Sequence, residues 1–459
     1  MNNTMMRAAR IMAIVFLLLA TLAGGSAWAA DAVATSPVKR TRYLLLDSRI
    51  VENTENAKLT AGTVVKHSGN PLFGEDKPWE QRFDNLYANV FYDAADGLYK
   101  CWYSPFIVDH SSKGMSIERR HKTQYRPPGI RAIRAGKAVY CEKPLTWSVW
   151  EALQLAAEAE KHKVPTQMSN QGMGSWGWRI AYDYVKAGAI GQIKEVHTWT
   201  GEHDGWFTNG IRTPEGQDPV PEGLNWDLWL GPAPVRPYKT RHYHPARWRG
   251  WIDFGNGALG DWCCHLMNAF YKILEPGYPV SVECTGSTGP AIDSYPKGKT
   301  VKWQFPTDGD RPAFDAYWYD GVNQPPKMPG LEDDRKMGPA GSYLVGTKGT
   351  CWVVGSHNNS ALLVPETRRK EFGKPKTAAP PSRGHETEFL MAARGEIPYN
   401  APLSHFGYGG KLTAVALMGN IAARVKGKLL YDAKAHRFTN SDEANKLMTR
   451  KPRDGWYVG

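Results

Sequence analysis

The pattern of hydrophobic and polar positions changes character along the chain. Residues 30 to about 122 predict strands and loops, and the aromatic-rich runs 86–92 and 98–103 predict a hairpin with a Gly-containing turn. A Pro- and Gly-rich stretch at 125–129 marks a boundary. Beyond it, short apolar runs alternate with stretches that repeat apolar residues at helical spacing, which predicts an α/β or α+β fold.

The second part of the chain predicts a succession of strands and helices without internal repeats. Ser148 begins one helix, because Glu151 stands three residues later and completes a capping box. The expected strands are 138–141, 165–168, 193–200, 280–284, 300–305 and 343–346, and the expected helices are 130–135, the one from 148, 178–186, 260–274, 386–394 and 412–425. Residues 370–383 are Lys- and Pro-rich and predict an exposed loop.

The N-terminus predicts export. Two arginines, Arg7 and Arg10, precede the apolar run 11–22, and the sequence Ala-Trp-Ala at 27–29 fits the small-residue cleavage rule. Residues 1–29 are therefore predicted to be a signal peptide of a periplasmic or secreted protein. The run is shorter than an ordinary membrane span, so no span is expected after cleavage; an uncleaved anchor is the alternative.

Composition narrows the class of ligand. The chain has 459 residues and a formal net charge of +12, but no long Lys/Arg block, so we expect a diffusely charged surface and no nucleic-acid partner. Its six cysteines are scattered apart from Cys263 and Cys264. They predict small buried hydrophobic side chains, and no metal site is expected because a Cys-x-x-Cys pair is missing.

Two motifs carry candidate chemistry. Glu142, Lys143 and Pro144 follow a predicted strand, where the Lys143 ammonium could polarise a substrate hydroxyl; a surface lysine in a tight turn is the alternative. Asp261 and His265 are four residues apart and share one face of a predicted helix. Asp261 could orient the His265 imidazole as a general base, whereas a solvated pair is the alternative.

The strand, Glu-Lys-Pro and capped helix, followed by Asp-x-x-x-His, resemble the Gfo/Idh/MocA family of sugar oxidoreductases. The resemblance implies a truncated dinucleotide-binding (Rossmann) remnant over 123–190. It then implies a substrate and oligomerisation domain over 191–459, with a large open, mostly antiparallel sheet. It further implies NAD or NADP, a sugar or cyclitol hydroxyl as substrate, and a homo-oligomer. Residues 30–122 resemble about one blade of a secreted β-propeller glycosidase-like protein.

The resemblance also assigns site residues. Lys143, Asp261 and His265 would be catalytic. The cofactor-binding residues would be Glu142, Pro144, Asn170 and Gln171, and the substrate-binding residues His244, Arg249, Trp251 and Trp206.

The expected phosphate-binding loop is missing from its usual place. Between Ala30 and Glu142 the sequence has no Gly-x-Gly pair. Two Gly-x-Gly-x-x-Gly strings, 172–177 and 255–260, occur only after Glu-Lys-Pro, so we reject both as the phosphate loop. The sequence thus leaves two alternatives, an oxidoreductase impaired by this loss or a degenerate carbohydrate-binding protein, and either a natural fusion or a sequence artefact could produce it.

A third class, a glycosidase, is the weakest. Asp47, Asp84 and Asp93 supply carboxylates in the N-terminal part. A single blade could not frame a two-carboxylate site.

Overall fold

A computed structural model describes most of the C-terminal three-quarters of the chain. The described residues are 89–93, 98–102, 128–201, 207, 209–222, 224–243 and 247–454. The chain divides into two units, 1–73 and 74–459, and every described residue belongs to the second. The predicted signal peptide and most of the predicted blade lie outside the described residues.

The expected N-terminal hairpin is present. Strand β1 (Asn89–Asp93) pairs antiparallel with β2 (Leu98–Trp102), with Phe91 opposite Lys100. The likeness to a propeller blade stays a prediction, because one hairpin does not test it.

A small βαβ unit follows helix α3 (Pro128–Arg134). Its strands β3 (Val139–Glu142) and β4 (Thr166–Ser169) run parallel and are joined by α4 (Val149–His162). The Ser148 hydroxyl accepts the backbone N–H of Glu151, whose carboxylate accepts the Ser148 N–H, so the predicted capping box begins α4. A parallel pair with a helical crossover is the repeating unit of dinucleotide-binding folds, and here it occurs once among the described residues.

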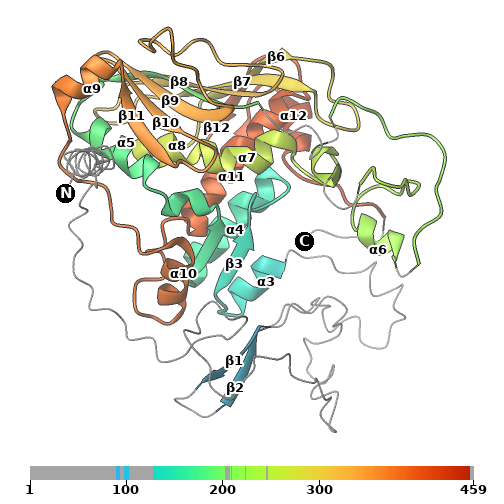
Figure 1. Cartoon of the computed structure of the whole chain (residues 1–459). Coiled ribbons are helices and arrows are strands. Elements are labelled where there is room, and N and C mark those ends of the chain that lie inside the picture. Colours follow the sequence, from blue (N-terminus) through green and yellow to red (C-terminus); the bar gives the residue numbers. More distant parts are fainter. Residues whose placement is uncertain are drawn as a thin grey trace, which may run out of the picture. The chain divides into compact units, whose positions relative to one another are not determined.

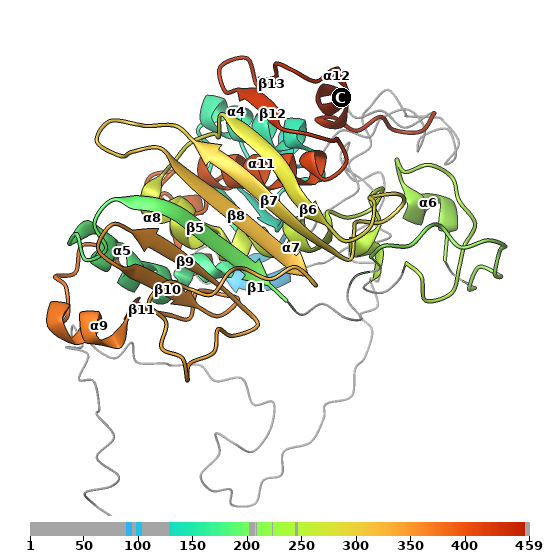
Figure 2. The ribbon, with the colours of Figure 1, turned by 90° about the horizontal axis from the view of Figure 1, so that it is seen from above.

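A nine-stranded sheet forms the larger part of the described structure (Figures 1 and 2). Its order is β11-β10-β9-β5-β8-β7-β6-β12-β13, and only the β5–β8 pairing is parallel. The strands are β5 (Ile193–Thr200), β6 (Ser281–Ser287), β7 (Gly298–Phe305), β8 (Phe314–Gly321), β9 (Ala340–Gly346), β10 (Thr350–Val354), β11 (Ser360–Val364), β12 (Leu429–Asp432) and β13 (Arg437–Phe438). The predicted mostly antiparallel sheet is therefore confirmed.

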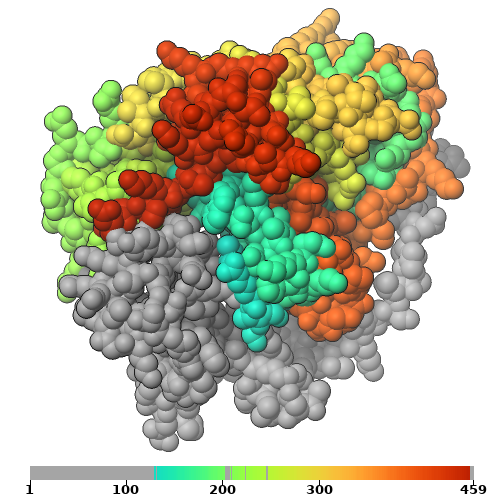
Figure 3. Space-filling view, turned by 180° about the vertical axis from the view of Figure 1, so that it is seen from behind, coloured from blue at the N-terminus to red at the C-terminus, as the bar shows by residue number. Residues whose placement is uncertain are grey.

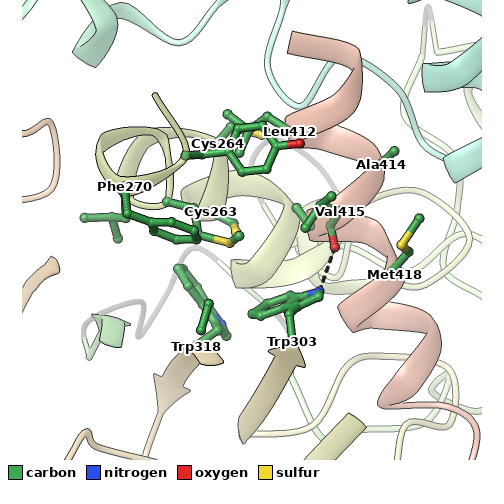
Figure 4. Close-up of a cluster of buried hydrophobic side chains, with 14 of the residues drawn as sticks. Cys263, Cys264, Phe270, Trp303, Trp318, Leu412, Ala414, Val415 and Met418 are labelled. Atoms are coloured by element: carbon green, nitrogen blue, oxygen red, sulfur yellow. Dashed lines mark hydrogen bonds between the residues drawn. The ribbon is translucent and has the colours of Figure 1, made fainter. Parts of the chain in front are cut away.

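Helices cover one face of this sheet, as Figure 2 shows. The covering helices are α5 (Gly177–Lys186), α7 (Gly257–Leu266), α8 (Asn268–Leu274) and α11 (Phe406–Ala422). Alternate strand residues such as Trp303 and Trp318 point into this layer and are fully buried there (Figure 4). The Trp303 Nε1–H donates to the Val415 carbonyl at 3.0 Å, which ties β7 to α11 (Figure 4).

The intervening strand residues form a second cluster on the other face. Trp199, Tyr343 and Trp352 are buried there against Met328 and Leu331 from the β8–β9 connection. The remaining short helices are η3 (Gln171–Gly174), α6 (Trp226–Leu230), η4 (Arg247–Gly250), α9 (Glu366–Phe372), α10 (His385–Ala393) and α12 (Asp442–Leu447).

The C-terminal segment packs on the βαβ unit. Figure 3 shows the last residues, in red, beside the teal surface of α3 and α4. The Trp150 N–H donates to the Met448 carbonyl at 3.0 Å, so the end of α12 is fixed to the first turn of α4.

Several predicted elements differ in their bounds. The single helix expected over 260–274 is two helices, α7 and α8, which meet at Met267. Five strands, β8, β10, β11, β12 and β13, were not predicted, and α9 occupies the start of the loop expected at 370–383. Within the described ranges, no helix combines the length and the apolar character that a membrane crossing needs.

Candidate active site

The predicted catalytic residues come together from two separate elements. Lys143 follows β3, and Asp261 and His265 lie on successive turns of α7. The Lys143 ammonium donates to the Asp261 carboxylate at 2.6 Å and to the Asp261 carbonyl at 3.0 Å. The predicted proximity of Lys143 to the Asp-x-x-x-His helix is thus present in the structure.

The partner of Asp261 differs from the expected one. Its carboxylate pairs with Lys143, and the Arg249 Nε lies 3.9 Å from its second oxygen. Within the described part of the chain, Nδ1 of His265 is buried and has no hydrogen-bond partner. Asp261 therefore holds Lys143 and does not orient His265, because tertiary packing places the ammonium closer than the imidazole four residues away.

His265 is a buried neutral imidazole. Its exposed fraction is 1%, and burial lowers its pKa well below the ordinary value, with further lowering by Lys143, His357 and His385. The neutral form is the one that can accept a proton at physiological pH. Its neighbours Lys143 and Arg249 are only half-buried, so the site opens to the surface on their side.

A second histidine, not predicted from the sequence, adjoins this site. His357 lies in the loop between β10 and β11, and its ring centroid is 4.8 Å from that of His265. Burial and the charge of Lys143 lower its pKa. Predicting a β-hairpin over 350–364 would have located this loop, but the polar residues of the loop gave no periodic signal.

The predicted cofactor-binding residues have different environments. Asn170 is fully buried; its amide donates to the Cys264 carbonyl and to Asn268, while its own Oδ1 has no partner among the described residues. Glu142 and Gln171 are exposed, and Pro144 is half-buried. All four frame the same end of the βαβ unit, beside Lys143.

The glycines of the string 172–177 are used for internal packing. A side chain at Gly177 would overlap the Asn358 carbonyl, and one at Gly172 would lie 3.2 Å from the His357 carbonyl oxygen. Without side chains, these glycines allow the β10–β11 loop to pack closely against residues 172–177. The rejection of this string as a pyrophosphate loop is therefore supported by its contacts.

The second string, 255–260, is also packed internally. A side chain at Gly255 would overlap the backbone of Arg249, and one at Gly260 would overlap Asn256. Both strings therefore have glycines that pack closely against other parts of the chain.

The predicted substrate-binding residues have different environments. Trp251 is wrong as a sugar-stacking residue, because it is 0% exposed and its Nε1–H donates to the His242 carbonyl. Arg249 lies at the site, with its guanidinium carbon 4.7 Å from the Trp248 ring centroid. His244 and Trp206 lie outside the described residues.

Comparison with solved structures finds distant likenesses. An NAD-binding protein from Listeria innocua shares 17% identity, with 67% of this chain and 79% of that chain covered and a TM-score of 0.42. An aldose-aldose oxidoreductase from Caulobacter crescentus shares 17% identity, with 67% and 76% covered and a TM-score of 0.42. The WlbA dehydrogenase from Bordetella pertussis shares 16% identity, with 66% and 74% covered and a TM-score of 0.41. No curated protein matches the chain.

One family model matches the sequence itself. It is described as the oxidoreductase family, C-terminal alpha/beta domain, of the Gfo/Idh/MocA group, and it covers residues 184–305. This segment runs from the end of α5 to the end of β7 and contains Arg249, Asp261 and His265. The resemblance to the Gfo/Idh/MocA family expected from the sequence is therefore confirmed over residues 184–305, which match the C-terminal α/β domain of that oxidoreductase family.

Proposed function

We propose that this protein is an NAD(P)-dependent oxidoreductase that acts on a hydroxyl group of a sugar or cyclitol. The observation that carries the proposal is the Lys143–Asp261 ion pair beside the buried, neutral His265. A carbinol oxidation needs a base for the hydroxyl proton and a cation near the oxygen, and this cluster contains both.

Each residue has a distinct task in this proposal. His265 accepts the hydroxyl proton, because its neutral ring has an acceptor nitrogen at physiological pH. Lys143 donates a hydrogen bond to the same oxygen, and Asp261 fixes the ammonium at 2.6 Å. Arg249 contributes a second cation at the open side of the site, where it can bind a further hydroxyl.

The residues present fit the reacting end of a nicotinamide dinucleotide. Lys143, Pro144 and the exposed Gln171 stand at the carboxyl ends of β3 and β4, where the resemblance places the nicotinamide; Asn170 is fully buried there, and its Oδ1 has no partner among the described residues. The dinucleotide supplies the acceptor for hydride. For the diphosphate, both glycine-rich strings are already packed against the chain, so they do not supply the helix N-terminus that usually binds it.

The close internal packing of both glycine-rich strings favours an alternative function of another class. A chain that keeps the hydroxyl-binding cluster but binds no dinucleotide would be a non-catalytic carbohydrate-binding protein. In that case Arg249 and Lys143 would bind sugar hydroxyls without turnover.

Calorimetric titration of the mature protein with NADH and then NADPH separates the two functions. Saturable binding in the micromolar range supports the oxidoreductase, whereas no binding up to about millimolar by a folded protein supports the alternative. With a bound cofactor, turnover of a panel of sugars and cyclitols is followed by nicotinamide absorbance.

The matched variants are H265A and, as a control distant from the site, H436A. We expect H265A to lower kcat/KM by about 100-fold or more, because general base catalysis contributes about that much, while the cofactor Kd changes little. Unchanged turnover in H265A would contradict the proposal.

We further propose that the chain is exported, on the strength of the signal-peptide pattern at 1–29. Expression of the full chain and N-terminal sequencing of the periplasmic product should give a mature start near Ala30. A product that begins at Met1 and stays in the membrane fraction would indicate the uncleaved anchor.

A further inference from the structure

A pocket lies where the helices α4, α7 and α11 meet. It is formed by the first residues of α4, by Asn256 at the start of α7 and by the end of α11, and it encloses about 280 Å³ of space that is partly open to solvent. The Tyr295 ring and Leu447 of α12 complete its wall, and none of the three candidate catalytic residues lines it. A space of this size suits a small ligand and is too small for a dinucleotide.

The N-termini of two helices reach this pocket. Ser148 and Val149 line it at the start of α4, which has 14 residues, and Asn256 lines it at the start of α7, which has 10. The first turn of α7 is buried and has no side-chain cap, and the Asn256 amide instead donates to the Thr146 carbonyl at 3.1 Å. The N–H groups of a helix's first turn carry partial positive charge and favour an anion.

Arg424 adds a full positive charge to the pocket. It is half-buried just after α11, lines the pocket, and forms no ion pair with another described residue. Two carboxylates of this region already have partners. The Glu151 carboxylate accepts the N–H and the hydroxyl of Ser148, and Asp253 pairs with Arg236. The Arg424 guanidinium is therefore the cation of this pocket that is left to pair with a ligand.

Two neutral side chains add an acceptor and a donor. Asn420 is 4% exposed and lines the pocket; its amide donates to the Asn256 carbonyl at 2.8 Å, while its Oδ1 is buried and has no partner among the described residues. An unpaired buried acceptor is unfavourable, so it points to a ligand that carries a hydrogen-bond donor. Burial raises the pKa of the Tyr295 hydroxyl, which therefore keeps its proton and can donate it in a hydrogen bond. The charge of Arg424 partly opposes this rise, because the guanidinium lies near the hydroxyl.

We propose that this pocket binds inorganic hydrogen phosphate. Arg424, the Tyr295 hydroxyl and the first turn of α7 donate to its charged oxygens, and the Asn420 Oδ1 accepts its remaining P–OH proton. Donors from three separate elements suit a tetrahedral anion better than a planar carboxylate. Sulfate has the same shape and no proton at neutral pH, so it would leave the Asn420 Oδ1 unpaired. The site is independent of the proposed oxidation, because none of its groups belongs to the Lys143–Asp261–His265 cluster.

Calorimetric titration of the mature protein with inorganic phosphate and, separately, with sulfate tests the site. The buffer contains no other oxyanion, and the ionic strength is held constant because salt screens charge. We expect saturable phosphate binding that is at least about 3- to 10-fold tighter than sulfate binding, the effect of one neutral hydrogen bond. R424Q should weaken phosphate binding by about 10- to 100-fold, because a charge-assisted hydrogen bond is lost. R437Q removes an exposed arginine of β13 that does not line the pocket and should leave both affinities unchanged.

Further outcomes separate the parts of the proposal. N420A should weaken phosphate binding by about 3- to 10-fold and leave sulfate binding unchanged, because only phosphate donates to Oδ1. If N420A does not fold, the ratio of phosphate to sulfate affinity in the unaltered protein decides this point. Equal affinities for the two anions would overturn the assignment to hydrogen phosphate. An absence of phosphate binding by the folded protein would overturn the site itself. Equal weakening in R424Q and R437Q would also overturn it, because the net charge of +12 would then attract the anion without a specific pocket.

Discussion

Replacing Lys299 by Met should destabilise the protein strongly. Lys299 on β7 and Asp320 on β8 are direct cross-strand partners, their ion pair is 2.6 Å long, and their side chains are 1% and 3% exposed. Asp320 also accepts the Lys299 backbone N–H at 2.9 Å and the Trp318 Nε1–H at 2.8 Å. K299M removes the cation and leaves the carboxylate buried with two neutral donors.

The expected cost is about 3–5 kcal/mol, the usual range for breaking a buried ion pair from one side. The same two strands provide a matched control in Lys302 and Asp315, which form a pair of 2.7 Å on the opposite face with side chains 25% and 27% exposed. Since water screens that pair, K302M should cost only about 0–1 kcal/mol.

Urea unfolding followed by tryptophan fluorescence and circular dichroism measures both variants. The double variant K299M/D320N should recover most of the loss, because the neutral amide can still accept from Trp318 and no unpaired charge remains. A K299M midpoint equal to that of K302M would refute the reasoning that burial decides the cost.

Two further predictions concern local packing and pH. G177A should lower the free energy of unfolding by about 1–3 kcal/mol, because the new methyl group overlaps the Asn358 carbonyl. The control G338A should change the free energy of unfolding little, because the space around Gly338 is open. Equal thermal midpoints for the two variants would contradict this prediction. Glu158 receives hydrogen bonds of 2.8 and 3.0 Å from Arg134, which lower its pKa from 4.5 to about 2. The stabilising contribution of the Glu158 carboxylate is therefore present above about pH 4.5 and is lost as the pH falls toward 2. The difference in urea midpoint between the unaltered protein and E158Q should therefore disappear over that pH range. A difference that stays constant would contradict the prediction.

Local signals in the sequence predicted local structure well. The capping box at Ser148 located the start of α4, and the alternating run 193–200 gave β5 with its observed bounds. Among the strands that were missed, β10 is a short apolar run buried on both faces, which periodicity does not distinguish from other buried segments.

Contacts between distant residues were less accessible from the sequence. Lys143 and Asp261 are 118 residues apart, so helical spacing could only suggest that Asp261 faces His265, its neighbour on the same helix. The position of His357 depends on the β10–β11 hairpin and on the close packing of α5 against it, neither of which leaves a periodic trace. Trp251 was misjudged because an aromatic residue beside a binding segment and a buried core residue look alike in sequence.

Proton chemistry and dinucleotide affinity are separable in this chain. His265 is held by α7, and His357 by a loop that α5 and α7 anchor, so their geometry follows from the packing of the large sheet. Affinity for a dinucleotide depends strongly on a helix N-terminus that binds its diphosphate, and both glycine-rich strings are occupied by internal contacts. A loss of diphosphate binding would raise the cofactor concentration needed for half-saturation without altering the acceptor nitrogen of His265. A neutral, buried His265 combined with weak cofactor binding is therefore physically self-consistent, and under the proposed function it would describe an oxidoreductase limited by cofactor affinity.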